Sequence, residues 1–101
     1  MTAFEESVRG ALESLPPELA DKLDNVAVVI EDEDPYRPDT LGLFETEPNM
    51  PHKITIFRLP LEADFGDDPA ELERQIRITV LHELAHFFGL DEGRLGDLGY
   101  G

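Results

Sequence analysis

The sequence predicts a small α/β (α+β) protein, in which helices at both ends of the chain flank a set of short strands. Three observations carry this prediction. Apolar residues have helical spacing over residues 3–15, β-branched runs occupy residues 26–30 and 53–59, and a helix over residues 68–88 has clear start and stop signals. With 101 residues, the chain is long enough for one compact domain, expected to cover residues 1–101.

Two helices are expected before the first strand. Acidic residues alternate with apolar ones over residues 3–15, which indicates an amphipathic helix with one face to cover. Pro16 stops this helix, and Pro17 can open a second, short helix that extends to about residue 23. The run at residues 26–30 then favours a mostly buried strand.

Two further strands are expected in the middle of the chain. Residues 41–45 give a short strand, weakened by Gly42, and residues 53–59 give a better one. In the second strand, Ile54, Ile56 and Arg58 would share one face, and Lys53, Thr55, Phe57 and Leu59 the other. The acidic run between the first two strands is interpreted as a solvated connection, because it lacks the ligand spacing of a calcium-binding loop.

The last helix has the clearest boundaries. Asp68 is a suitable N-cap, Pro69 suits the first helical position, and Glu71 stands where a capping box has its glutamate. Gly89 follows as the residue that best tolerates the left-handed conformation at a helix end. Apolar residues cover a wide arc, so we expect this helix to be buried along most of its C-terminal half.

A histidine pair lies on that helix, in the segment His82-Glu83-Leu84-Ala85-His86. Two helical residues four apart are separated by about 40° of rotation and about 6 Å of rise, so both imidazoles project from one face. This spacing lets two ring nitrogens bind one Zn²⁺ ion at about 2.0–2.1 Å. Glu83 lies on the neighbouring flank, where it can take a proton from water as the general base.

A catalytic zinc site needs a third protein ligand, with one position left for water. Because the helix ends at Gly89, the chain can turn back towards the histidines, and Asp91 and Glu92 are then the natural suppliers. His52 is a more remote alternative, although a loop histidine is more often simply exposed.

The stretch from His82 to Glu92 resembles the extended zincin motif, in which the third ligand lies three residues past the glycine. That position is Glu92 here, where zincin families usually have His or Asp, so Asp91 stays open as the alternative third ligand. Further segments join the motif helix in the resemblance: Leu41 to Glu45, Ile54 to Arg58, Arg94-Leu95 and Leu98-Gly99-Tyr100. Together they resemble the minimal zincin-like metallopeptidases, small bacterial proteins with an HExxHxxGxxE or HExxHxxGxxD motif, over residues 25–101.

The resemblance implies a small mixed sheet packed against the active-site helix, with helices at the N-terminus. It also implies a zinc-dependent metallopeptidase that hydrolyses a peptide bond with metal-activated water, with His82, His86 and Glu92 as the zinc ligands and Glu83 as the general base. In zincins an edge strand beside the site commonly holds the substrate backbone by β-augmentation, and residues 54–59 are the strand expected to do so.

Some groups of larger zincins have no counterpart in this sequence. Only nine residues follow Glu92, and no methionine lies downstream of the motif, which excludes the metzincin branch. For Tyr36, Arg58 and Tyr100 we expect structural or surface roles rather than oxyanion stabilisation. The alternative function is therefore a catalytically inactive zincin-like domain that acts as a protein-binding or structural module.

The amino-acid composition limits the classes of molecule that this protein can bind. Eight Lys and Arg against 23 Asp and Glu give a formal charge of −15, which disfavours nucleic acid and anionic membranes as partners. The resemblance implies a peptide or protein substrate. There is no cysteine for a disulfide or a thiolate metal site. Glu5 and Glu6 stand where a signal peptide would carry positive charge, so a cytoplasmic location is expected.

Overall fold

The computed structural model describes residues 2–89 of the chain. In chain order the elements are α1 (Ala3–Glu13), α2 (Pro17–Ala20), the 3-10 turn η1 (Asp21–Leu23), β1 (Val26–Glu31), β2 (Gly42–Glu45), β3 (His52–Phe57), α3 (Arg58–Phe65) and α4 (Pro69–Phe88). The three strands form a mixed sheet, in which β3 pairs with β1 in parallel and with β2 antiparallel. The predicted α/β (α+β) class with a small mixed sheet is confirmed.

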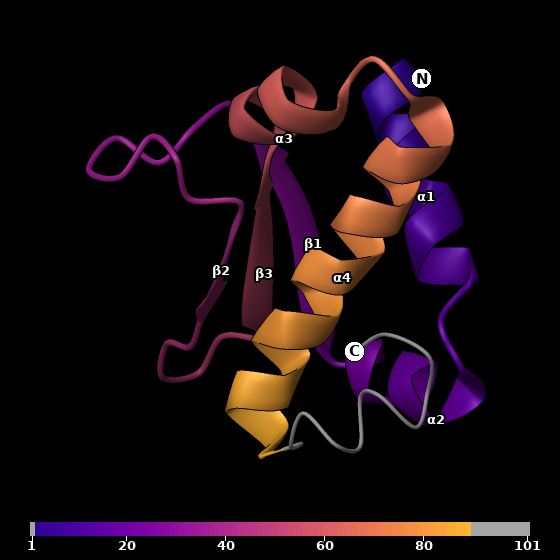
Figure 1. Ribbon diagram of the computed structural model, residues 1–101. Helices are drawn as coiled ribbons and strands as arrows, with labels where there is room; N and C mark the ends of the chain where they lie inside the picture. Colours follow the sequence, from indigo (N-terminus) through magenta and orange to yellow (C-terminus); the bar gives the residue numbers. More distant parts are fainter. Residues whose placement is uncertain (1, 90–101) are drawn as a thin grey trace.

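Helices α1 and α4 lie side by side on one face of the sheet, and α4 crosses in front of the strands (Figure 1). The core between the helices and the sheet is apolar. From α1 it takes Phe4, Val8 and Ala11; from β3, Ile54 and Ile56; and from α4, Leu72, Ile76, Val80, Leu81 and Leu84. The wide apolar arc of α4 therefore serves to cover both the sheet and α1.

Strand order corrects two of our expectations. The central strand is β3, so the prediction that residues 54–59 form the edge strand for a substrate is wrong. Among residues 2–89, β1 pairs on one side only, and none of its residues is fully buried, so the prediction of a mostly buried strand at residues 26–30 is also wrong. A β-branched run is compatible with an edge strand as well as a central one, because side-chain type alone does not determine how many neighbours a strand has.

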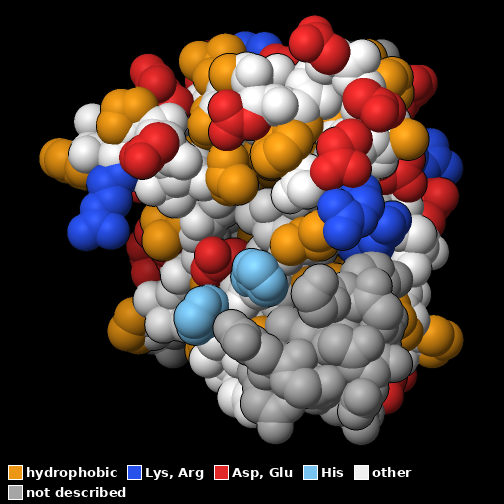
Figure 2. Space-filling view, viewed as in Figure 1, with side chains coloured by type: hydrophobic (Ala, Val, Ile, Leu, Met, Phe, Trp, Pro, Cys, Tyr) orange, Lys and Arg blue, Asp and Glu red, His pale blue; other side chains and the backbone are white. Residues whose placement is uncertain are grey.

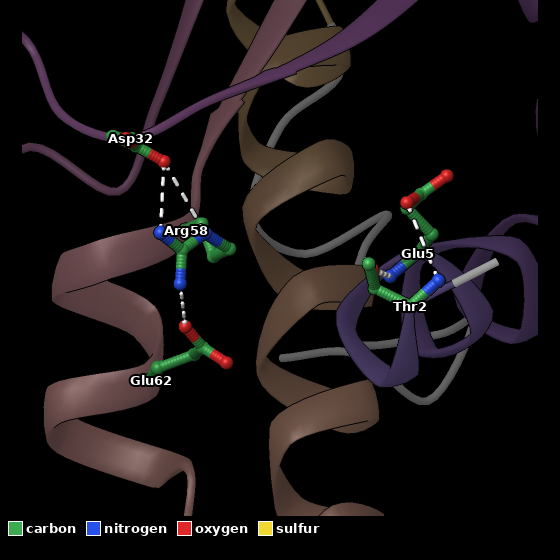
Figure 3. Close-up of polar contacts among 5 residues, drawn as sticks. All are labelled: Thr2, Glu5, Asp32, Arg58 and Glu62. Carbon is green, nitrogen blue, oxygen red and sulfur yellow. Dashed lines mark hydrogen bonds and ion pairs between the residues drawn. The ribbon is translucent and has the colours of Figure 1, made fainter.

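The end of β3 differs from the prediction as well. The strand stops at Phe57 and the helix α3 begins at Arg58, so Arg58 and Leu59 are helical. The Arg58 guanidinium lies between Asp32, which follows β1, and Glu62 on α3, and binds both carboxylates (Figure 3). The Leu59 N–H also donates to the Asp32 carbonyl at 2.9 Å. Pro60, tolerated in the first turn of a helix, is a signal for this boundary in the sequence.

Side chains cap the two long helices at their N-termini. In α1, Thr2 and Glu5 form a reciprocal capping box (Figure 3). In α4, Asp68 accepts hydrogen bonds from the N–H groups of Ala70 and Glu71, at 3.0 and 3.3 Å, which confirms it as the N-cap. The expected reciprocal bond, from the Asp68 N–H to the Glu71 side chain, is absent among the described residues, because the Asp68 N–H donates to the Phe65 carbonyl instead. None of the helices described is both long and apolar enough to span a bilayer.

Candidate metal centre

The C-terminal half of α4 is only partly buried. Leu81, Leu84 and Ala85 face the core, while His82 and His86 are exposed. The helix ends at Gly89, which has φ 69° and whose N–H donates to the Ala85 carbonyl, as the glycine stop signal predicts. Burial along most of this half was too strong an expectation, since Phe87 and Phe88 are 41% and 36% exposed.

The two exposed histidines fit two positions of a zinc site. They stand four residues apart in a continuous helix, so both imidazoles leave α4 on one side, and imidazole nitrogen is a preferred zinc donor. Two histidine side chains are visible on the face shown in Figure 2, on a surface rich in carboxylates. Within residues 2–89, no group of three His, Cys, Asp or Glu side chains is arranged to hold a metal ion. The predicted third ligand, Glu92 or alternatively Asp91, lies outside the described residues.

Glu83, between the two histidines, is half-buried. Its burial raises the pKa of the carboxyl group, while the charges of His86 and His82 and a hydrogen bond from the backbone of Phe44 act in the opposite direction. The net direction is upward, which favours proton acceptance near neutral pH. The raised pKa is therefore consistent with the predicted general base.

Strand β2 approaches α4 closely beside Glu83. A Cβ atom added to Gly42 would lie 2.5 Å from Cγ2 of Thr79 and 3.7 Å from Cγ of Glu83. A real Cβ does not come as close to a methyl group as 2.5 Å, so only glycine allows this spacing between strand and helix. Gly42, which weakened the strand prediction at residues 41–45, is thus the residue that allows β2 to lie close to Glu83.

The sequence model of the zincin-like metallopeptidases matches residues 23–100. The chain belongs to the zincin-like metallopeptidase family. No curated protein matches it. The family match covers β1, β2, β3, α3 and α4, so the arrangement described above of a histidine-bearing helix against a small mixed sheet lies entirely within the matched region.

Substitution of Gly42 tests the close approach in this zincin-like domain. We expect Gly42→Ala to lower the free energy of unfolding by about 1–3 kcal/mol, because the new methyl group overlaps Thr79. Combining it with Thr79→Ser should recover most of this loss, since serine lacks Cγ2 but keeps the hydroxyl that donates to the Gln75 carbonyl at 2.8 Å. Urea denaturation of the four proteins in this cycle provides the measurement. An equal loss with threonine and with serine at position 79 would contradict the proposed overlap.

Aromatic rings join β2 to α4 one turn beyond Glu83. The rings of Phe44 and Phe87 stack, with centroids 4.4 Å apart and an interplanar angle of 17°. His52, at the start of β3, packs its ring 4.5 Å from Phe87 and 5.7 Å from Phe44. His52 therefore lies among aromatic rings, with its Nδ1 buried and without a hydrogen-bond partner in the described part of the chain.

Sequence reasoning did not single out Phe44 or Phe87 as neighbours of the site. The signals were the four-residue spacing of Phe87 from Glu83 on α4 and the two-residue spacing of Phe44 from Gly42 on β2. Each spacing places a ring on the same face as a site residue, but neither indicates which strand meets the helix.

Two of the three groups considered for oxyanion stabilisation lie in the described region. Tyr36 is 92% exposed in the loop between β1 and β2. Arg58 is occupied by its two carboxylate partners, whose hydrogen bonds raise its pKa. Tyr100 lies outside the described residues.

Proposed function

We propose that this protein is a zinc-dependent peptidase that hydrolyses a peptide bond, with His82 and His86 as zinc ligands and Glu83 as the general base. The observation that carries the proposal is the position of Glu83. It lies beside the two exposed imidazoles, on the neighbouring flank of α4, and accepts a hydrogen bond from the backbone of strand β2. A potential base, two potential metal ligands and a strand backbone thus converge on one surface, as peptide hydrolysis requires.

The proposed site residues have distinct roles in this reaction. His82 and His86 would hold Zn²⁺ with Glu92, or with Asp91, as the third ligand. When bound, the ion would polarise the scissile carbonyl and acidify water at the site. Glu83 would accept a proton from the attacking water and return it to the nitrogen of the departing amine. The amine then leaves as a neutral molecule rather than as an anion.

Within residues 2–89, β2 pairs with β3 on one side only, and its other, open edge is the proposed binding site for the substrate backbone. The Phe57 N–H donates to the Leu41 carbonyl at 3.0 Å, and pairing alternates along an antiparallel ladder. The backbone groups of Gly42 and Phe44 therefore point away from β3, towards the open edge. An extended peptide can pair with the Gly42 backbone and the Phe44 carbonyl on this edge, while the Phe44 N–H bonds to Glu83.

The charge of the chain supports a preference among peptides. At −15, the protein attracts cationic ligands over long range and repels anionic ones. We propose that peptides with basic residues are captured faster than acidic ones, with the difference falling as salt increases.

Metal removal tests the proposed function. Protein purified without chelator and without a histidine tag should contain one equivalent of zinc and should hydrolyse members of a mixed peptide library. Removal of zinc with a chelator should abolish cleavage, and added Zn²⁺ should restore it, because water is not acidified without the ion. Elemental mass spectrometry and mass-spectrometric detection of peptide products provide the two measurements.

The same experiment distinguishes a zinc peptidase from the alternative, non-catalytic function. Zinc binding that raises the melting temperature without cleavage of any library peptide would indicate a non-catalytic zincin-like module. Full cleavage activity after complete removal of the metal would contradict a zinc-dependent mechanism.

A further inference from the structure

Strand β2 contacts α4 through three neighbouring turns of the helix. Gly42 meets Thr79, the Phe44 backbone meets Glu83, and the Phe44 ring meets Phe87. Thr79, Glu83 and Phe87 are spaced by four residues and therefore lie along one side of α4. The general base of the proposed reaction is thus the middle one of three contacts between the same strand and the same helix side.

Phe44 makes two of these contacts with different parts of its structure. Its N–H belongs to the open edge of β2 and donates to the Glu83 carboxylate. Its ring lies on the helix-facing side of the sheet, stacked at 4.4 Å on Phe87. Because ring and N–H belong to one residue, the ring contact restricts where the N–H can lie relative to α4.

We propose that Phe44 is a positioning residue for Glu83, and that the stack of Phe44 on Phe87 keeps its N–H in register with the Glu83 carboxylate. A carboxylate on a flexible glutamate side chain has several rotamers, and a charge-assisted hydrogen bond from a fixed N–H selects one of them. The inference rests on the proposed function, since it assigns Phe44 a role through the base rather than on the substrate.

The Phe44–Phe87 stack can be broken from either side without substituting Glu83, His82 or His86. Phe87→Leu removes the ring from α4, and Phe44→Leu removes it from β2, while both keep apolar side chains of similar bulk. Phe44→Tyr keeps the ring and should behave as the original protein. Phe88→Leu is the matched control on the helix. It removes a neighbouring ring, which contacts the edge of Phe87 and the Lys22 ammonium, but keeps both rings of the Phe44–Phe87 stack.

For the active zinc-loaded enzyme, we expect Phe87→Leu and Phe44→Leu each to lower kcat by about 10- to 100-fold through misplacement of the base. KM for a library peptide and zinc content should stay unchanged. The double variant should lose no more than either single variant, because both remove the same contact. Phe44→Tyr and Phe88→Leu should retain kcat, and a loss of kcat in Phe88→Leu equal to that in Phe87→Leu would overturn the proposal.

A second measurement does not depend on activity. In ¹H–¹⁵N spectra, Glu83→Gln should shift the backbone amide of Phe44, because a neutral amide oxygen is a weaker acceptor than a carboxylate. The shift should largely disappear when Phe87→Leu is already present and persist when Phe88→Leu is present. An equal shift in both backgrounds would overturn the positioning role. Absence of cleavage by the original protein, with these shifts as expected, would instead count against the proposed function alone.

Discussion

Replacement of Glu83 by glutamine should lower peptide hydrolysis by about 100-fold or more while leaving the zinc content unchanged. Glutamine matches glutamate in shape but cannot accept a proton from water, and general acid–base catalysis typically contributes about 10²- to 10⁴-fold. Glu83 is not one of the proposed zinc ligands, so the histidine pair remains available for the metal. Turnover of a library peptide and elemental analysis of the same preparations measure the two effects.

Glu73→Gln is the matched control for this change. Glu73 lies on the same helix, and its carboxylate is close to Gly10 of α1 rather than to the histidines. The control variant should keep full turnover, since it changes the charge of the protein by the same amount without altering the site. Hydrolysis that survives Glu83→Gln would exclude Glu83 as the base.

Loss of His86 should deplete the protein of zinc. We expect His86→Ala to contain less than one-tenth of the zinc of the original protein after dialysis, because removal of one imidazole leaves too few donors for a stable tetrahedral site. The exposed position of His86 means that the substitution leaves no cavity in the core. Circular dichroism should therefore show a folded, zinc-depleted protein.

His52→Ala tests whether the third zinc ligand is His52 or an acidic residue, Glu92 or Asp91. His52 packs among Phe44 and Phe87, and we expect its substitution to lower stability while zinc stays bound. A zinc loss as large as that of His86→Ala would make His52 a ligand and would exclude a site completed by Glu92 or Asp91 alone.

Local signals predicted α4 well. Its N-cap aspartate, its first-turn proline and its terminal glycine all act within one turn of the residues that they organise, so they can be recognised in the sequence. The four-residue spacing of the histidines likewise depends only on the helix. The metallopeptidase family was therefore within reach of sequence reasoning, and the family match confirms it.

Long-range pairing was less accessible. Nothing in the residues of β1 and β3 indicates which is central, because both carry enough apolar side chains for either position. The strand-to-helix change at Arg58 depends on Asp32, which comes from the end of another strand. Similarly, the contact between Glu83 and Phe44 requires knowledge of which strand lies against α4.

The open edge of β2 also bears on self-association. An unpaired strand edge can bind the same edge of a second copy as readily as it binds a peptide. Two features oppose this: β2 has only four residues, and the net charge of −15 makes neutral-pH copies repel one another. The repulsion vanishes near the isoelectric point of about 4.2. In acidic solution, therefore, charge repulsion no longer opposes pairing of the β2 edges of two copies. The carboxylates of this protein thus keep it dispersed in neutral solution.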